Sequence, residues 1–179
     1  MQAECVIEFW RATQKRGLEI CIDGGWAVDA VLKRQTRPHN DLDIALPAAE
    51  VSALRQLLTA RGYVEVPRPD SWEHNFVLED PQGRLIDVHS YILNPDGSNA
   101  GGVSYVADQI AGSGVILGTP VRCVPPLWLV QSHTGYELRQ SDWHDVRLLC
   151  SEFNLEIPPD FEELAASDGQ EGGPKNASK

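Results

Sequence analysis

Residues 20–46 carry the run ICIDGGWAVDAVLKRQTRPHNDLDIAL. A short β-branched segment leads through Gly24 and Gly25 into a helical apolar pattern, then a basic loop, then an alternating strand pattern. In that last part Asp41 and Asp43 alternate with apolar residues, so we expect both carboxylates on one face of a strand. Side chains two residues apart on a strand lie roughly 6.6 Å from each other. This spacing suits two carboxylates that hold a pair of divalent ions roughly 3.5–4 Å apart.

The context of the two aspartates decides how the pattern is interpreted. Two acids separated by one residue are usually solvated side chains on an exposed strand face. Gly24 and Gly25, however, would let backbone N–H groups approach a phosphate at the positive end of the following helix. Arg37 and His39 precede the acids and could contact the β- and γ-phosphates. The combination predicts a site for a nucleoside triphosphate and for magnesium, which prefers carboxylate and phosphate oxygens.

A third acid, Asp87, lies in a later apolar strand pattern, where an unpaired charge is costly. A solvent-facing strand residue is the competing interpretation of Asp87. His89 follows two residues later and shares its face of the strand. For His89 the competing interpretation is a hydrogen-bonded structural histidine.

Composition limits the class of protein. A chain of 179 residues makes one domain, or one domain with a small appendage. A formal net charge of -11 argues against nucleic acid as a partner. The four cysteines form no C-x-x-C pair, and each is expected to be reduced and buried. The sequence has no signal-peptide pattern and no apolar run long enough to span a membrane, so a cytoplasmic location without membrane association is expected.

The order of the expected elements predicts an α+β (mixed α/β) fold, with a mixed sheet flanked by helices and a small C-terminal helical appendage. Helices are expected at 3–16, 26–34, 48–61, 127–135 and 142–153, strands at 20–22, 41–46, 63–66, 74–79, 84–92, 113–120 and 121–124, and a surface loop at 94–104. These give an α/β domain at 1–124, a helical segment at 125–160 that lines a substrate pocket, and a disordered tail at 161–179.

The quoted motifs resemble a known family. GGW at 24–26, TRPHNDLDI at 36–44 and IDVH at 86–89 resemble the antibiotic nucleotidyltransferases of the polymerase-β-like superfamily. The runs SHTGYE at 132–137 and SDWHDVRLLC at 141–150 resemble the lincosamide nucleotidyltransferases in particular, with the aminoglycoside 2″-nucleotidyltransferases next. The resemblance covers roughly residues 5–160 and implies the nucleotidyltransferase fold.

The resemblance also implies roles for the acids. Asp41 and Asp43 would bind magnesium, two ions being expected, and Asp87 would complete the catalytic and metal-binding carboxylates. Members of the family transfer a nucleoside monophosphate, commonly AMP from ATP, to a drug hydroxyl. Asp87 or a nearby acid could serve as the general base. Active sites in this family can lie near a subunit interface, which admits a homodimer.

The drug pocket is expected to involve His89, His133, Tyr136 and Glu137. Helix-end packing and capping is a nearly equal interpretation of His133 and Tyr136. A group of polar residues at the start of the last helix is expected to form an exposed structural cap, with Asp142 as N-cap. The remaining members of that group are His144 and Asp145.

Two alternatives stay open at this point. Within the enzyme class, an aminoglycoside would require several acids in the pocket, whereas a lincosamide carries one amine and an apolar part that favours aromatic walls. Candidates for such walls are Trp72, Trp128, Tyr136 and Trp143. From another class, a small nucleotidyltransferase-like antitoxin or binding module would share the glycine and aspartate motifs, but would lack the helical pair after Pro125 and Pro126.

Overall fold

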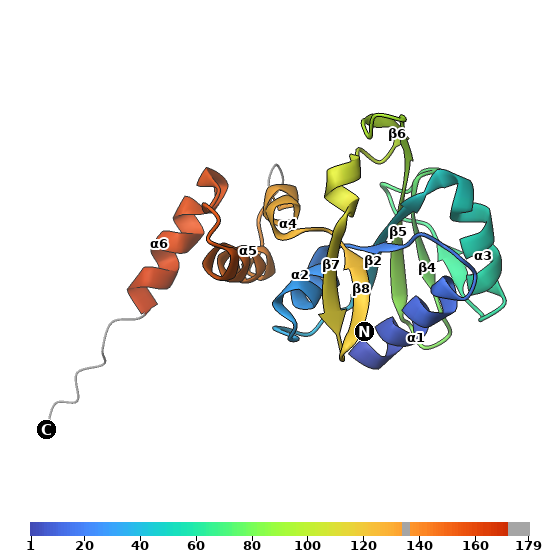
Figure 1. Cartoon of the computed structure of the whole chain (residues 1–179). Coiled ribbons are helices and arrows are strands. Elements are labelled where there is room, and N and C mark those ends of the chain that lie inside the picture. Colours follow the sequence, from blue (N-terminus) through green and yellow to red (C-terminus); the bar gives the residue numbers. More distant parts are fainter. Residues whose placement is uncertain (134–136, 172–179) are drawn as a thin grey trace, which may run out of the picture. The chain divides into compact units, whose positions relative to one another are not determined.

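The chain forms two compact units, Met1–Pro125 and Pro126–Lys179 (Figure 1). The computed structural model describes residues 1–133 and 137–171, and side chains through residue 166. The first unit is a sheet flanked by helices, and the second is helical (Figure 1). The predicted mixed α/β fold is therefore confirmed.

One mixed sheet organises the first unit. Its strands are β1 (Cys21–Ile22), β2 (Asp41–Pro47), β3 (Val64–Val66), β4 (Asn75–Glu79), β5 (Leu85–Leu93), β6 (Asn99–Gly102), β7 (Gly112–Ile116) and β8 (Thr119–Cys123). The strand order is β3-β4-β5-β2-β1-β8-β7, and β6 pairs with β5. The β2–β5 and β1–β8 pairs are parallel, and the other pairs are antiparallel. The two strands that carry the predicted acids, β2 and β5, are thus direct neighbours.

The alternation predicted for the aspartate strand is confirmed. Leu42 and Ile44 are fully buried, whereas Asp41 and Asp43 are only partly buried. The apolar pair is therefore committed to the core, which directs both carboxylates to the opposite face of β2.

Helices pack on this sheet through apolar faces. They are α1 (Ala3–Gln14), α2 (Gly24–Leu32), η1 (Ala48–Glu50), α3 (Val51–Thr59) and η2 (Ala107–Ile110). The amphipathic helices α1 and α3 bury the apolar stripes that their sequences predict, for example Val6 and Phe9 in α1 and Leu54 in α3. In α2 every residue from Trp26 to Leu32 is buried. The helix approaches β7 closely because Gly114 has no side chain where a Cβ would meet the Ala30 backbone.

One strand departs from the prediction. Residues 94–104 were expected to form a loop, but Asn99–Gly102 forms β6 and pairs with β5 across a register shift near Ile92. Its sequence, NAGG, has no β-branched residue, so strand propensity gives no signal. The side-chain amide of Asn99 donates to three backbone carbonyls, those of Gly101, Val103 and Tyr105, and so holds the segment in place.

The second unit contains α4 (Pro126–Ser132), α5 (Gln140–Phe153), η3 (Pro159–Phe161) and α6 (Glu162–Glu171). The prediction of a disordered tail at 161–179 is wrong for residues 161–171. Phe161 is fully buried, and its ring stacks on Trp143 with centroids 5.9 Å apart. Glu162 and Glu163 then favour a helix start, because acidic side chains complement the positive end of the dipole. Residues 172–179 lie outside the described part.

The start of α5 also differs from the prediction. Arg139 occupies the N-cap position, and Asp142 lies three residues later, where its carboxylate accepts the Arg139 N–H at 2.8 Å. Asp142, His144 and Asp145 were expected to form an exposed polar cap. This is wrong for two of the three residues, because Asp142 and Asp145 are 2% and 0% exposed. Their spacing of three residues places both on the inward face of the helix.

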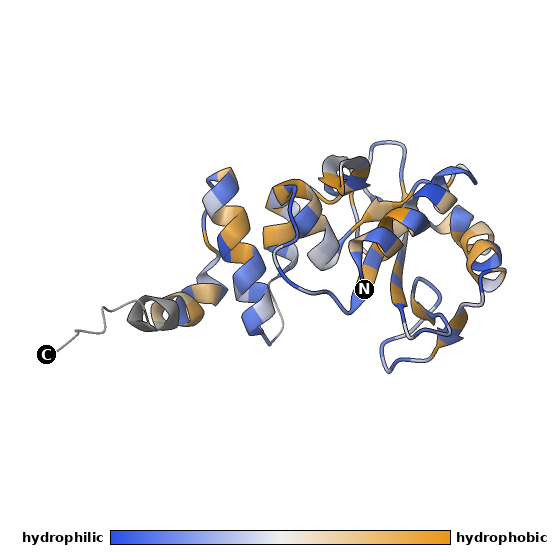
Figure 2. Cartoon of the chain, turned by 90° about the horizontal axis from the view of Figure 1, so that it is seen from below, coloured by the Kyte–Doolittle hydropathy of each residue, from blue (hydrophilic) through white to orange (hydrophobic). Residues whose placement is uncertain are grey.

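Figure 2 shows hydrophobic and hydrophilic residues interleaved along the helices rather than gathered in long apolar runs. No helix within 1–133 or 137–171 is long and apolar enough to cross a membrane.

Replacing Phe161 tests how the second unit is held together. We expect Phe161→Ala to lower the free energy of unfolding of the helical unit by about 3–5 kcal/mol, as for other buried phenylalanines. Urea unfolding followed by tryptophan fluorescence measures the loss. Phe153→Ala is the matched control, because Phe153 is 37% exposed and its loss should stay below about 1 kcal/mol. Equal losses in the two variants would contradict the assigned packing.

Candidate active site

Four carboxylates gather where β1, β2 and β5 run side by side. The parallel register pairs Asp43 with Asp87, and Asp41 lies two residues earlier on the same face of β2. Asp23 follows β1 directly, and its N–H donates to the Asp43 carbonyl at 2.9 Å. The structure therefore brings together the three predicted acids and adds Asp23, which the sequence analysis did not include.

The cluster concentrates negative charge in a partly buried space. Burial raises the pKa of Asp43 well above its usual value, and the nearby carboxylates of Asp41, Asp23 and Asp87 raise it further. Burial also raises the pKa of Asp87, although His89 acts in the opposite direction. The Oδ1 atom of Asp87 is buried and accepts no hydrogen bond from any described residue. A bound cation would remove these costs.

The side chains of the cluster suit magnesium, because the oxygen atoms that they offer as ligands all belong to carboxylates. As the side chains stand, no three histidine, cysteine, aspartate or glutamate side chains within 1–133 and 137–171 form a ready-made ion cage. Magnesium is usually held by one or two carboxylates together with substrate phosphates, so a complete protein cage is not required. The arrangement suits an ion that arrives with a phosphorylated substrate.

The glycine turn lies directly against this cluster. Asp23 is the N-cap of α2, and its Oδ1 accepts the Gly24 N–H at 2.7 Å. Gly24 has φ +56°, and a Cβ there would overlap the Asp43 carboxylate. At Gly25 a Cβ would lie 2.5 Å from His39 Nδ1. Both glycines are thus required by close approach, and they keep the helix N-terminus beside the acids.

His39 is buried and pairs with the buried carboxylate of Asp29. His39 is 5% exposed, its Nε2 lies 2.5 Å from Asp29 Oδ2, and its ring lies 4.6 Å from that of Trp26. Asp29 also accepts the N–H and the hydroxyl of Thr36 at 2.8 Å, so the pair fixes the basic loop onto α2. A contact of His39 with phosphate stays a prediction.

Arg37 lies beside the same turn. Its side chain is half-buried, and its Nη2 lies 2.6 Å from where a Cβ on Gly25 would stand. The guanidinium is thus directed toward the start of α2, where a phosphate would bind. That placement is compatible with the predicted nucleotide-binding role of Arg37.

A hydrogen-bonded tyrosine connects the two sides of the site. Tyr105, 4% exposed, donates its hydroxyl proton to Asp23 Oδ2 at 2.5 Å and lies 3.2 Å from His89 Nδ1. His89 Nε2 in turn lies 3.5 Å from Asp87 Oδ1. Sequence reasoning missed Tyr105 because it follows a glycine-rich segment 82 residues from Asp23 and carries no local motif.

A pocket of about 290 Å³ opens at the acids. Asp41 and Asp87 line it together with Arg68 and Asp70 from the segment between β3 and β4. Asp70 also contributes to raising the pKa of Asp87. Neither Arg68 nor Asp70 was predicted, because charged residues in a loop are ordinarily solvated and their nearness to Asp87 depends on tertiary structure.

The remaining substrate candidates belong to the second unit. His133 is 8% exposed, and its Nδ1 lies 2.6 Å from the Leu129 carbonyl, which is the helix-end packing given as the alternative. Glu137 is exposed, and Tyr136 lies outside the described residues. Trp143 packs in the core of this unit rather than on its surface. In the first unit Trp72 is 50% exposed.

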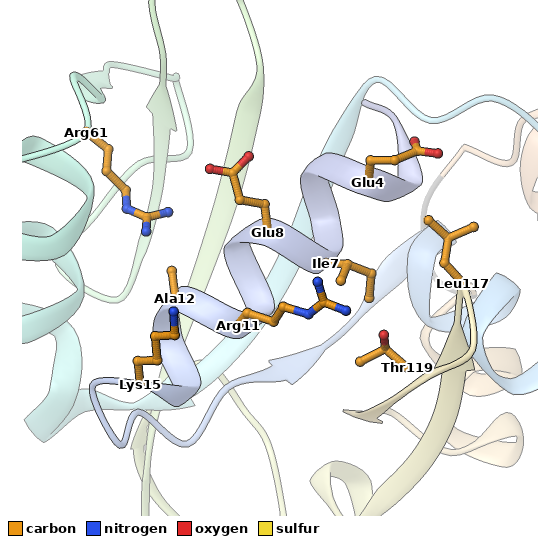
Figure 3. A pocket seen from close by; sticks show the side chains of 9 residues that line it. All are labelled: Glu4, Ile7, Glu8, Arg11, Ala12, Lys15, Arg61, Leu117 and Thr119. Atoms are coloured by element: carbon orange, nitrogen blue, oxygen red, sulfur yellow. The ribbon is translucent and has the colours of Figure 1, made fainter.

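A larger pocket of about 470 Å³ lies along α1 (Figure 3). Its charged lining changes sign along the helix, with Glu4 and Glu8 toward the N-terminus and Arg11 and Lys15 toward the C-terminus. This order complements the helix dipole. The pocket shares no lining residue with the acid cluster, so it has no part in the candidate site.

Carboxylates on adjacent parallel strands, with a glycine turn against them on a mixed sheet, define the nucleotidyltransferase class. The sequence model of the aminoglycoside-2″-adenylyltransferase family matches residues 6–149. The chain belongs to this family and is an enzyme of the antibiotic nucleotidyltransferase class. The antitoxin or binding-module alternative is therefore not adopted.

Two individual relatives agree with the match to the family model. A lincosamide resistance protein of Staphylococcus haemolyticus is 31% identical over 137 residues, which cover 73% of this chain and 83% of the relative. A 2″-aminoglycoside nucleotidyltransferase of Escherichia coli is 27% identical over 173 residues, or 87% of this chain and 89% of the relative. The structure of the lincomycin-bound lincosamide adenylyltransferase LnuA has a TM-score of 0.70 at 24% identity, with 82% of this chain and 94% of that chain covered. This last likeness shows the fold.

Alanine at Gly24 tests the close approach of turn and carboxylate. We expect Gly24→Ala to cost at least about 2 kcal/mol more in the free energy of unfolding than Gly118→Ala, because the new Cβ must displace Asp43. Gly118 is the matched control, since it also has a positive φ (+72°) but has no atom within 4 Å of its Cβ position. Urea unfolding of both variants gives the comparison. If the two substitutions cost the same, backbone strain alone explains them and the approach to Asp43 is not required.

Proposed function

We propose that this enzyme transfers AMP from ATP, with magnesium, to a hydroxyl group of a lincosamide antibiotic. The observation that carries the proposal is the cluster of Asp41, Asp43 and Asp87, in which the neighbouring carboxylates raise the pKa of Asp43 and against which the Gly24 turn is packed. Such a cluster needs divalent metal, and the helix start beside it suits phosphate.

Different residues would bind the nucleotide and the metal ion. The turn at Gly24 and Gly25 brings the start of α2 to the triphosphate, the Gly24 N–H itself being held by Asp23, and Arg37 supplies positive charge at the same turn. Asp41 and Asp43 would hold magnesium, with Asp87 as the third carboxylate. When bound, magnesium would neutralise phosphate charge and polarise the α-phosphate.

Bond making and breaking balance without a covalent enzyme intermediate. The drug hydroxyl oxygen forms a bond to the α-phosphorus, and the bond from that phosphorus to the β-bridging oxygen breaks, releasing pyrophosphate. The hydroxyl proton passes to Asp87 as the general base. Positioning and electrostatics supply most of the rate enhancement.

The choice of a lincosamide over an aminoglycoside rests on the acids left for the acceptor. With Asp41 and Asp87 committed to metal, Asp70 is the one remaining acid that lines the 290 Å³ pocket in the described structure. One carboxylate suits a drug with one amine, and the exposed ring of Trp72 two residues later suits an apolar part. The 31% identity to a lincosamide resistance protein supports the same choice.

An aminoglycoside remains the second candidate. It is favoured by the family model and by the relative that is 27% identical over 173 residues. A homodimer, a cytoplasmic location and roles of His133, Tyr136 and Glu137 in drug binding remain predictions.

Mass spectrometry of drugs incubated with enzyme, magnesium and each of the four nucleoside triphosphates tests the proposal. We expect lincomycin or clindamycin to gain one AMP when ATP is the donor. Asp41→Ala and Asp43→Ala should lower turnover about 1000-fold or more, because metal assistance is worth several kcal/mol. Asp96→Ala, in an exposed turn, is the control and should keep turnover within about twofold. Transfer to a kanamycin-type drug alone would assign the aminoglycoside instead, and transfer to neither drug class would overturn the proposal.

A further inference from the structure

Two side chains of opposite charge line the 290 Å³ pocket beside the carboxylates of Asp41 and Asp87. They are Arg68 and Asp70, both exposed and both carried by the segment that joins β3 to β4. Arg68 is the one cationic side chain that lines the pocket in the described structure, and it forms no salt bridge with any described residue. Its charge is therefore available to a molecule that enters the pocket. The proposed chemistry gives Arg68 no task.

Hydrogen bonds fix the backbone from which these two side chains reach the pocket. The Arg68 N–H donates to Ser71 Oγ at 3.0 Å, and the Ser71 N–H donates to the Arg68 carbonyl at 3.1 Å. The side-chain amide of Asn75 donates to the Asp70 carbonyl at 3.2 Å, and Asn75 also exchanges two backbone hydrogen bonds with Trp72. Asn75 belongs to β4, so the sheet itself holds the segment beside the acids.

The pocket lies on the side of the acids that faces away from the glycine turn. Gly24 follows β1, which borders β2 on one side, whereas β5 and then β4 lie on the other side of β2. Val77 of β4 pairs with Asp87 of β5 and lines the pocket with it. A triphosphate at the start of α2 would leave this side free. The molecule that enters here is therefore the acceptor, whose hydroxyl meets Asp87.

The charges around this acceptor pocket balance once a metal ion is bound. A divalent ion would neutralise Asp41 and Asp87, and Arg68 and Asp70 then contribute one charge of each sign. The Debye length is about 10 Å in 0.1 M salt, so charges that line a pocket of 290 Å³ act on any amine inside it. An acceptor with several amines would meet no net attraction, and Arg68 would repel each amine.

We propose that Arg68 is a specificity-determining residue, which repels acceptors with several positive charges and, balanced by Asp70, admits an acceptor with a single amine. Selectivity of this kind uses a repulsive element as well as attractive contacts. The inference rests on the proposed function, because it assigns the pocket to the acceptor. It also predicts a property that requires no turnover, namely the affinity of the pocket for a polycation.

An NMR titration with kanamycin, used as the polycationic probe, tests the proposal in protein with magnesium and without nucleotide. We expect Arg68→Gln to raise the affinity at least about 5-fold in about 20 mM salt, because a like charge is removed. The gain should fall below about 2-fold in about 0.5 M salt, which screens exposed charges. Arg68→Lys retains the charge and should stay within about 2-fold of the wild type. The Arg68 side chain is exposed, so these variants should fold.

Arg61→Gln is the matched control. Arg61 is also an exposed arginine, but it lines the pocket along α1 (Figure 3), which shares no residue with the acid site. The same change in net charge should there alter kanamycin affinity less than about 2-fold. Asp70→Asn should act in the opposite direction and lower the affinity about 5-fold, because Arg68 is then unopposed.

Three results of the titration would overturn the proposal. They are an unchanged or lower affinity in Arg68→Gln, an equal gain in Arg61→Gln, and an unchanged affinity in Asp70→Asn. A merely structural role of Arg68 predicts the first of these, since a disordered segment would weaken binding of every acceptor.

Turnover separates this inference from the proposed function. Arg68→Gln should lower the ratio of kcat/KM for lincomycin to that for kanamycin at least about 5-fold, and Arg68→Lys should preserve the ratio. An unchanged ratio, or kanamycin still unmodified by Arg68→Gln, contradicts the proposal. If the wild type modifies neither drug, the proposed function fails, while the titration still decides the role of Arg68.

Discussion

The site depends on one steric constraint, the close approach of Gly24 to the Asp43 carboxylate. No side chain other than hydrogen fits at position 24, because a Cβ there would overlap Asp43. The turn between β1 and α2 can therefore rest on β2, with Asp23 capping the helix and donating its own N–H to the Asp43 carbonyl. This contact places a helix N-terminus, which attracts phosphate, against carboxylates, which attract metal. The phosphate groups of a nucleotide and a metal ion would then bind next to each other.

The same contact concentrates negative charge in a half-buried space. Burial and three neighbouring carboxylates raise the pKa of Asp43, so the fold carries an electrostatic cost that a divalent cation would relieve. Sites that retain such a cost commonly do so for function rather than for stability. Hydrogen bonds around the cluster keep its members in place: Asp29 fixes the basic loop through His39, and Tyr105 joins the donor turn to the acceptor strand.

Features set by local pattern could be predicted from the sequence. The period-two alternation of β2 gave the shared face of Asp41 and Asp43, and the apolar stripes gave the flanking helices. Features set by tertiary contacts could not. Tyr105 meets Asp23 across 82 residues, and β6 is held by Asn99 rather than by strand-forming side chains. Phe161, which precedes the last helix, packs on Trp143, a contact that the polar, glycine-containing composition of the segment does not signal.

The titration of the Asp43 carboxyl, followed by ¹³C NMR in metal-free protein and again with magnesium, tests the central claim most directly. The crowding of carboxylates predicts that Asp43 titrates clearly above the ordinary aspartate pKa of about 3.9, because its charged form is disfavoured. Magnesium should lower that pKa, since the ion binds only the carboxylate form. A pKa of Asp43 at or below about 3.9 without metal, and unchanged by magnesium, would contradict the conclusion that these carboxylates form a binding site for a divalent cation.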